Sequence, residues 1–320
     1  MHFGCAGALP KLLFPSPSFH MASPSPACPP SSFELQAILD VAVSAARRAG
    51  AHMRAHLGTA SAGVQTTKAN FKDVVTAVDL ACQAKIAEVL AASLPAVQYT
   101  MLGEEDVAAG SAASAAALSA ATSSTTAPYL FVVDPLDGTT NFASGLPCSC
   151  VSIGVAHRGV VVAACIFDPY REETFTATRG GGAFLNGARL RVAAPPPTLG
   201  AAVMSVGFHS DAAVGAIMMR GAAAMLQQCR GIRNLGSAAL HLAYVAAGRL
   251  AGFWELDLSS WDIAAGFLLV AEAGGVVTDM RGAPYALATR DVIATAGGQL
   301  HADALAVLAE AGAQHMPTKE

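Results

Sequence analysis

Apolar and polar residues recur with different periods along the chain, and the change of period predicts helices first and strands later. The segment from Ser32 to about Leu57 carries apolar residues three and four positions apart, which is helical spacing. The residues concerned are Leu35, Ile38, Leu39, Ala42, Ala45 and Ala46. We expect one helix here and a second from Val78 to Leu94.

The pattern changes at Tyr129–Val133, a continuous apolar run of β-prone residues that predicts a buried strand. Further strands are predicted at Cys150–Ala156, Val160–Phe167 and Glu173–Thr178, and Asn186-Gly187 is typical of a hairpin turn. A second part begins near Ala201, with predicted helices at Ser210–Cys229, Ala238–Ala247 and Asp262–Ala273. This order of helices, strands and then both predicts an α/β fold of stacked sheets and helices rather than a repeating βαβ wheel.

Two segments differ from the rest in composition. Residues 1–32 are rich in Pro and Ser and contain no Asp or Glu, which indicates a disordered tail or, alternatively, a plastid transit peptide. Residues 107–127 are almost entirely Ala, Ser and Thr. A helix there would have no apolar stripe to bury, so we interpret the segment as a low-complexity surface insertion in a domain spanning 33–315.

The bulk composition excludes several classes of function. The chain has 320 residues, 53% of them hydrophobic, and a formal net charge of -4. Because it has no stripe of Lys and Arg and no apolar run of the ~18 residues that a membrane span needs, we expect neither a nucleic-acid partner nor a membrane. Its seven cysteines are odd in number and irregularly spaced, which favours a reducing compartment and a cytoplasmic protein, or a plastid one if the leader is a transit peptide.

Candidate chemistry follows the buried strand directly, in the stretch DPLDGTTNF from Asp134 to Phe142. Pro135 fixes one backbone angle and Gly138 permits a tight bend, so the carboxylates of Asp134 and Asp137 can point into one small volume. Two anions so close repel each other unless a cation joins them, and oxygen ligands favour Mg²⁺ or Mn²⁺ over zinc.

Two more acidic positions extend this picture. Glu104 begins an acidic cluster after Gly103, and Asp262 follows Trp261 just before an apolar helix. We expect Asp262 to be the N-cap of that helix or to face the metals from the helix N-terminus, where phosphate also binds readily.

Together these segments resemble the inositol monophosphatase family. The resemblance rests on GEE at Gly103–Glu105, the DPLDGTTNF stretch, WDIAAG at Trp261–Gly266 and EAGG at Glu272–Gly275, and it covers roughly residues 34 to 312. It implies a layered αβαβα sugar-phosphatase fold and, from the family alone, a homodimer. The run Ala143-Ser144-Gly145 and the Cys148-Ser149-Cys150 segment depart from the family pattern, at the rim of the site or a dimer contact.

The resemblance also implies a metal site with Mg²⁺ as the cofactor. Glu104 and Asp134, with the backbone carbonyl of Leu136, would hold a first ion. Asp134, Asp137 and Asp262 would hold a second, so that Asp134 bridges the pair. Glu104 is therefore counted among the catalytic residues as well as the metal ligands.

The other expected site residues orient the water and bind the substrate. Thr139 resembles the threonine that orients the attacking water, with Asp79 as its partner, although each could instead simply cap a helix. Substrate contacts are expected at the backbone of Gly138 and Thr139, at the segment Gly236, Ser237 and Ala238, and at Glu255, which matches an acid that binds sugar hydroxyls.

The resemblance therefore predicts hydrolysis of a phosphomonoester by metal-activated water, with myo-inositol monophosphate as the main substrate. L-galactose 1-phosphate, histidinol phosphate and fructose 1,6-bisphosphate remain rivals, because substrate choice lies in the pocket wall rather than in the metal ligands. The alternative from another class is a catalytically silent binding or scaffold protein on the same fold.

Overall fold

The computed structural model of the chain describes residues 30–59, 63–67, 74–95, 97–123, 127–192 and 198–314. The tail or transit peptide predicted at residues 1–32 falls almost wholly outside the described residues and stays a prediction. Residues from Ser31 onward form one structural unit. Its first helix, α1 (Ser32–His56), is capped by Ser31, whose hydroxyl accepts the Glu34 N–H at 3.2 Å.

The larger of the two main sheets has seven strands in the order β3-β4-β5-β6-β7-β8-β9. The strands are β3 (Tyr99–Gly103), β4 (Tyr129–Asp137), β5 (Cys150–His157), β6 (Val160–Asp168), β7 (Glu173–Thr178), β8 (Gly182–Leu185) and β9 (Ala188–Arg189). Only β3 and β4 are parallel within this sheet. The predicted hairpin turn is confirmed, because Asn186 and Gly187 both have positive φ, as a type I′ turn requires.

The smaller sheet has five strands in the order β11-β10-β12-β14-β13. They are β10 (Val203–Val206), β11 (Gly231–Arg233), β12 (Gly252–Glu255), β13 (Val276–Asp279) and β14 (Val292–Thr295), while β1 (Val64–Thr67) and β2 (Val74–Thr76) form a separate pair. Strand β10 is parallel to both β11 and β12, so its carboxyl end lies at the same edge as theirs.

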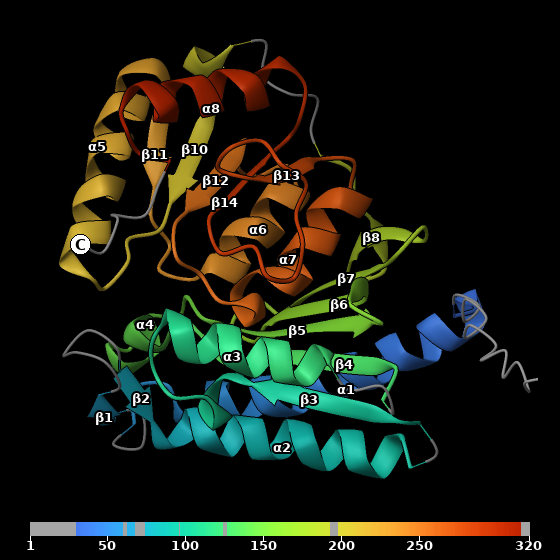
Figure 1. The fold of residues 1–320 in the computed structure, drawn as a ribbon. Coiled ribbons are helices and arrows are strands. Elements are labelled where there is room, and N and C mark those ends of the chain that lie inside the picture. Colours follow the sequence, from blue (N-terminus) through green and yellow to red (C-terminus); the bar gives the residue numbers. More distant parts are fainter. Residues whose placement is uncertain are drawn as a thin grey trace, which may run out of the picture. The chain divides into compact units, whose positions relative to one another are not determined.

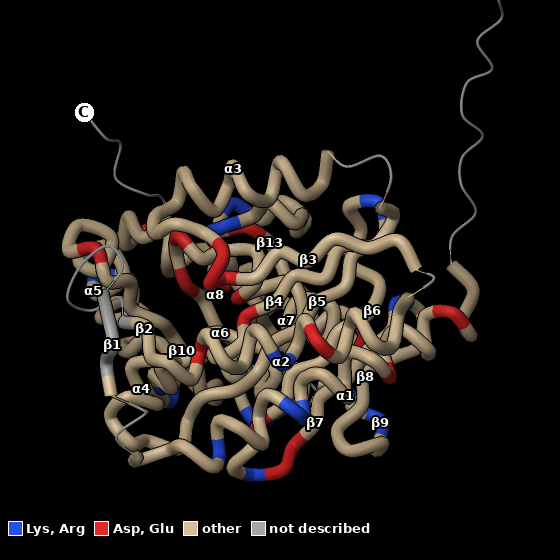
Figure 2. The backbone as a smooth tube through the Cα atoms, turned by 90° about the horizontal axis from the view of Figure 1, so that it is seen from below, with Lys and Arg blue, Asp and Glu red and all other residues tan. Residues whose placement is uncertain are grey.

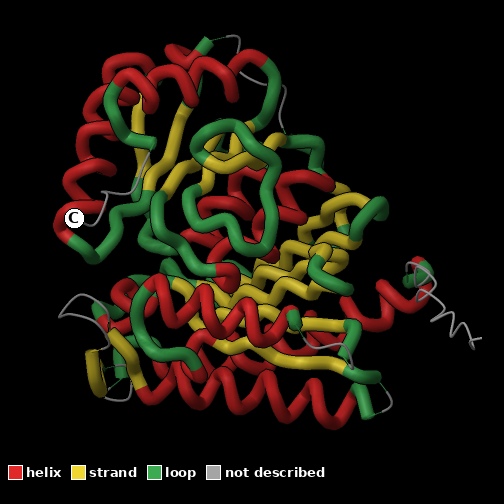
Figure 3. The backbone as a smooth tube through the Cα atoms, in the orientation of Figure 1, coloured by secondary structure: helices red, strands yellow, loops and turns green. Residues whose placement is uncertain are grey.

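Helices separate and cover the two sheets, which gives five layers (Figures 1 and 3). The helices are α1, α2 (Ala77–Ser93), α3 (Ser111–Thr122), α4 (Thr139–Ala143), α5 (Ala212–Gln228), α6 (Ala238–Ala246), α7 (Ser260–Glu272) and α8 (Gln299–Glu310), with short 3-10 turns at Glu104–Asp106 and Leu199–Ala201. Helices α1 and α2 cover the outer face of the large sheet, α6 and α7 lie between the sheets, and α5 and α8 cover the small sheet.

Side chains alternate between the two faces of each strand, and this alternation places each sheet between two cores. In β4, Leu130 and Val132 enter the core around α6 and α7, while Phe131 and Val133 enter the core beneath α1 and α2. In β12, Phe253 and Trp254 likewise face opposite cores. The layered α/β architecture expected from the sequence is therefore confirmed. None of the described helices is long and apolar enough to cross a membrane.

Helix α3 corrects our interpretation of residues 107–127 as a segment with nothing to bury. Leu118 is 8% exposed and belongs to the core around α7. Polar anchors hold the other end of the helix: Ser111 donates to Asp257 at 2.6 Å, and Arg290 donates to Ser114 at 2.6 Å and to Asp257 at 2.8 Å. Leu118, with Ala117 and Ala121 packed against the same core, therefore gives the helix a short apolar face, and the polar network anchors its first turn.

Replacing Arg290 with methionine should lower the free energy of unfolding by about 3 kcal/mol, because it removes the arginine that pairs with the buried Asp257 carboxylate. Urea unfolding at neutral pH measures the loss. Arg48→Met is the matched control, since Arg48 and Glu88 form an exposed ion pair worth about 0–1 kcal/mol. Equal losses for the two variants would show that the network does not anchor α3.

Candidate active site

Three of the predicted acidic residues meet at one point. Asp134 and Asp137 lie at the end of β4, where the pairing with β5 shifts register between them and turns both carboxylates to the same side. Asp262 comes from the first turn of α7. One carboxylate oxygen from each residue lies within 4.8 Å of those of the other two. The acids that the sequence singled out as separate segments therefore form one cluster.

One of our two expectations for Asp262, that it is the N-cap of α7, is wrong. Ser259 is the N-cap, and Asp262 is the third helical residue of a capping box, in which its carboxylate accepts the Ser259 N–H at 2.6 Å. One oxygen of Asp262 is thus tied to the backbone of its own helix, which orients the carboxylate toward β4.

The cluster is electrostatically unfavourable for the protein alone. Burial raises the pKa of Asp134 and of Asp262 well above the usual aspartate value, and the nearby charge of Glu104 raises both further. Burial also raises the pKa of Asp137 to about 6, although hydrogen bonds from Ser237 and from the backbone of Ala239 oppose this shift. A divalent cation removes such mutual repulsion, and an all-oxygen donor set suits Mg²⁺, so the residues present fit the predicted metal.

Glu104 and Leu136 stand beside this cluster. Glu104 begins the 3-10 turn after β3, and its charge acts on all three aspartates, but the 4.8 Å group itself consists of Asp134, Asp137 and Asp262. The N–H of Leu136 donates to Asp134 at 3.0 Å, and its carbonyl accepts from the Thr139 hydroxyl at 3.1 Å. The carboxylate of Asp134 therefore holds the backbone of the loop that follows it.

Thr139 and Asp79 are in direct contact, as predicted. The Thr139 hydroxyl lies 3.0 Å from Oδ1 of Asp79, which comes from the first turn of α2. The other oxygen of Asp79 accepts the Thr76 N–H at 2.9 Å and also the Thr76 hydroxyl, forming the capping box of α2. The helix-capping role and the contact with Thr139 thus coexist, one on each carboxylate oxygen.

The predicted substrate segment Gly236–Ala238 approaches Asp137 from the start of α6. Ser237, the N-cap of α6, donates its hydroxyl to Asp137 at 2.6 Å, and the N–H of Ala239 donates to the same oxygen at 2.7 Å. The Ser237 hydroxyl therefore donates its hydrogen to a candidate metal ligand.

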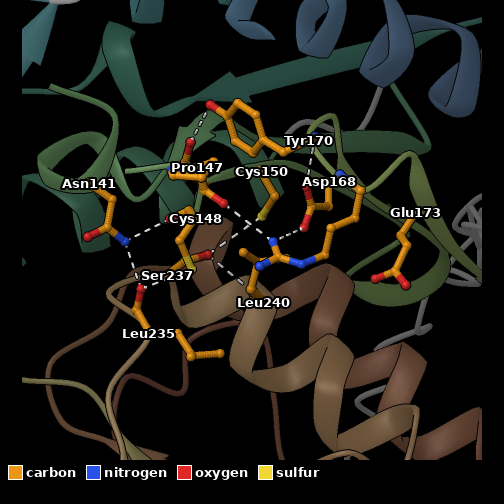
Figure 4. A network of polar contacts seen from close by, with 12 residues as sticks. Asn141, Pro147, Cys148, Cys150, Asp168, Tyr170, Glu173, Leu235, Ser237 and Leu240 are labelled. Atoms are coloured by element: carbon orange, nitrogen blue, oxygen red, sulfur yellow. Dashed lines mark hydrogen bonds and ion pairs between the residues drawn. The ribbon is translucent and has the colours of Figure 1, made fainter. Parts of the chain in front are cut away.

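Asn141 holds the two loops of the site together, a role that sequence reasoning did not assign. Its amide donates at 2.7 Å to the carbonyls of both Cys148 and Leu235 (Figure 4). Gly138 and Gly236, which have φ of 93° and 71°, lie against each other at this junction. A Cβ on Gly138 would come within 3.1 Å of the Gly236 carbonyl, so this close approach of backbones requires glycine.

A cavity of about 1150 Å³ opens in front of the acids. Its walls include Asp137, Asp262, the Gly236–Ala238 segment and Glu255, together with Arg171, Phe208, His209 and His241. The fold places His209 and His241 in the cavity wall, a position that only the tertiary structure reveals.

His241 is neutral in the folded protein. It is fully buried, stacks on Phe253 with ring centroids 4.6 Å apart, and its Nε2 accepts the Leu235 N–H at 2.8 Å. Burial lowers the pKa of His241 from 6.5 to about 3. Only the unfolded chain therefore takes up this proton between pH 6.5 and 3, and stability falls as the pH falls through that window.

Because of this histidine, lowering the pH from 8 to 5 should reduce the free energy of unfolding by about 2 kcal/mol. In His241→Gln that pH-dependent loss is absent. The difference in unfolding free energy between the wild type and the variant should therefore be about 2 kcal/mol smaller at pH 5 than at pH 8. Urea unfolding in EDTA at the two pH values measures it. Parallel pH profiles for the two proteins would contradict the prediction.

Comparisons with known proteins show the family to which this fold belongs. A sequence model of the inositol monophosphatase family matches residues 34–313, and the chain therefore belongs to that family. The chain is 40% identical over 258 residues to the Nus factor SuhB of Escherichia coli strain K12, covering 80% of this chain and 90% of that protein. It is 39% identical over 250 residues to the inositol-1-monophosphatase of Rhizobium meliloti, covering 77% and 86%.

Solved structures show the same fold. The extragenic suppressor protein suhB of Bartonella henselae superposes with a TM-score of 0.73 at 34% identity, over 85% of this chain and 98% of that one. An inositol monophosphatase from Anabaena superposes with a TM-score of 0.70 at 33% identity, over 87% and 97%. The family and fold expected from the motifs are confirmed.

Proposed function

We propose that the protein is a Mg²⁺-dependent phosphomonoesterase that hydrolyses myo-inositol monophosphate to inositol and phosphate. The convergence of Asp134, Asp137 and Asp262 carries this proposal, because few other functions require three carboxylates, two of them buried, within 4.8 Å of one another. Asp137 and Asp262 also line the cavity. The Rhizobium meliloti relative named as an inositol-1-monophosphatase supports it.

In this proposal the three aspartates, with Glu104 and the Leu136 carbonyl, hold the metal ions. Bound Mg²⁺ would supply positive charge that offsets the phosphate and makes a neighbouring water a better nucleophile. Asp79 accepts the hydrogen of the Thr139 hydroxyl, so the free lone pairs of that oxygen can accept a hydrogen bond from the attacking water and orient it.

The remaining groups bind the substrate. In this proposal the backbone N–H groups of Gly138 and Thr139 would bind the phosphate at the start of α4, and Glu255 would accept hydrogen bonds from ring hydroxyls. The Gly236–Ala238 segment lines one wall of the cavity. Glu255 suits this role because it is 9% exposed and lies in the cavity wall beside the acids. A carboxylate acceptor at this depth favours a polyol over histidinol.

A substrate panel at fixed Mg²⁺ tests the proposal. We expect phosphate release from inositol 1-phosphate that EDTA abolishes and Mg²⁺ restores. Preferred turnover of L-galactose 1-phosphate, histidinol phosphate or fructose 1,6-bisphosphate would change the proposed substrate but not the proposed reaction. Absence of Mg²⁺-dependent turnover with all four would overturn the enzymatic proposal.

A second candidate function, a binding role of the Nus-factor type, follows from the names of the SuhB relatives. Those names leave our expectation of no nucleic-acid partner unsupported. In Figure 2, Lys and Arg are spread over several elements with Asp and Glu between them, which gives no extended basic stripe on the described part of the chain. Binding of RNA or a transcription complex by an Asp134→Asn variant without activity would favour this second role.

We also propose that the protein is a homodimer, as expected from the family. Sedimentation at micromolar concentration should give twice the chain mass of 32.4 kDa. A monomer that still releases phosphate would show that the site is complete within one chain.

A further inference from the structure

Glu255 has an unusual neighbour on the adjacent strand. Strands β10 and β12 are parallel, with Val206 paired to Trp254, so the next position on each strand brings Gly207 beside Glu255. The Gly207 N–H donates to the Trp254 carbonyl at 3.4 Å, which continues the ladder by one step. Residues side by side in a sheet present their side chains to the same face, so any side chain at position 207 would share the face of Glu255.

A side chain at that position would meet the end of the Glu255 side chain. A Cβ built on Gly207 would lie less than 3.0 Å from the carboxylate carbon and both oxygens of Glu255. The backbone does not require glycine here, because Gly207 does not have a positive φ. The carboxylate of Glu255 therefore lies across the Cα of Gly207, and any side chain at position 207 would displace this carboxylate.

The surroundings of the carboxylate are buried and acidic. Glu255 is 9% exposed, and burial and then the nearby charges of Asp262 and Asp137 disfavour its ionised form. A carboxylate displaced from Gly207 changes the position from which its oxygens face a substrate, and any movement toward Asp262 or Asp137 brings like charges closer together.

We propose that Gly207 is a positioning residue that fixes the Glu255 carboxylate and thereby sets the recognition of substrate hydroxyl groups. The site it serves takes a polyol monophosphate, and the proposal rests on the function proposed above. Gly207 itself touches the substrate through no side chain, so its whole effect passes through Glu255.

The test combines Gly207→Ala with Glu255→Asp, whose shorter side chain does not reach across Gly207. Gly207→Ala should lower kcat/KM for inositol 1-phosphate roughly 100-fold, mostly through KM, because an acceptor for the hydroxyls is lost. With p-nitrophenyl phosphate, which has no ring hydroxyls, the change should stay within about 3-fold. In the Glu255→Asp background, Gly207→Ala should change kcat/KM for inositol 1-phosphate less than about 3-fold.

Gly200→Ala is the matched control, since its added Cβ meets only atoms 3.7 Å or more away, at the opposite end of β10. It should leave both substrates unaffected. Melting temperatures in EDTA give a readout that needs no activity. Gly207→Ala should lower the melting temperature when Glu255 is present and leave it unchanged in the Glu255→Asp background.

Equal losses with both substrates, or an undiminished effect of Gly207→Ala in the Glu255→Asp background, would overturn the positioning role. Failure of the proposed function is a different result: the wild type would then release no phosphate from either substrate, while the coupling in melting temperature would still report whether the two residues contact as inferred.

Discussion

Replacing Asp134 with asparagine is expected to lower kcat roughly 1000-fold or more, because the residue is the proposed bridge between two cations. Its side chain is 2% exposed and belongs to the cluster whose oxygens lie within 4.8 Å of one another. Asparagine keeps the oxygen that accepts the Leu136 N–H at 3.0 Å, so the loop after β4 should remain in place. The change therefore removes one negative charge and little else.

Stability measurements separate the metal role from a structural one. In EDTA the melting temperature of Asp134→Asn should be equal to or slightly above that of the wild type, since one of several repelling carboxylates is gone. Mg²⁺ at 100 times its dissociation constant should stabilise the wild type by about 2.7 kcal/mol and the variant much less. The control is Asp106→Asn, an exposed acid of the adjoining 3-10 turn, which should match the wild type in both respects. A large loss of stability in EDTA would make Asp134 a structural residue.

Local patterns predicted the elements that carry their own signals. The periodic apolar positions of α1, the buried run of β4 and the Asn186-Gly187 turn are each specified within a few neighbouring residues. We predicted no elements at β13, β14 and α8. The two strands have four residues each, and they are held by pairing with each other and, through β14, with β12. Short strands of this kind depend on tertiary contacts more than on their own sequence.

Helix α3 shows why composition misled us. Its sequence has a single leucine, and no local pattern reveals that Ser111 meets Asp257, 146 positions later, or that Ser114 meets Arg290, 176 positions later. The hydrogen bonds that anchor the helix exist only once the fold has brought those segments together.

The candidate site likewise has a part that the local sequence predicts and a part that depends on the fold. The motifs marked Asp134, Asp137 and Asp262, and the structure brings their carboxylates together. The motifs did not reveal that Asp137 accepts hydrogen bonds from the start of α6, or that Glu255 lies against Gly207. Residue types with the right chemistry can be recognised from sequence, whereas the neighbours that orient them are set by strand register and helix placement.

Replacing Thr139 with valine is expected to lower kcat about 100-fold while KM changes little, since the lost hydroxyl is proposed to orient the water and not to bind the substrate. Valine has nearly the same shape, and Asp79 keeps its hydrogen bonds to Thr76, so the start of α2 should stay intact. Thr139→Ser is the matched control, because it restores the hydroxyl that lies 3.0 Å from Asp79 and should recover most of the rate. Steady-state kinetics with inositol 1-phosphate at saturating Mg²⁺ measure both variants. A valine variant with the wild-type rate would contradict the prediction. Thr139 and Asp79 would then have structural roles alone, the first through its hydrogen bond to the Leu136 carbonyl and the second through its capping of α2. The attacking water would have to be oriented by other groups.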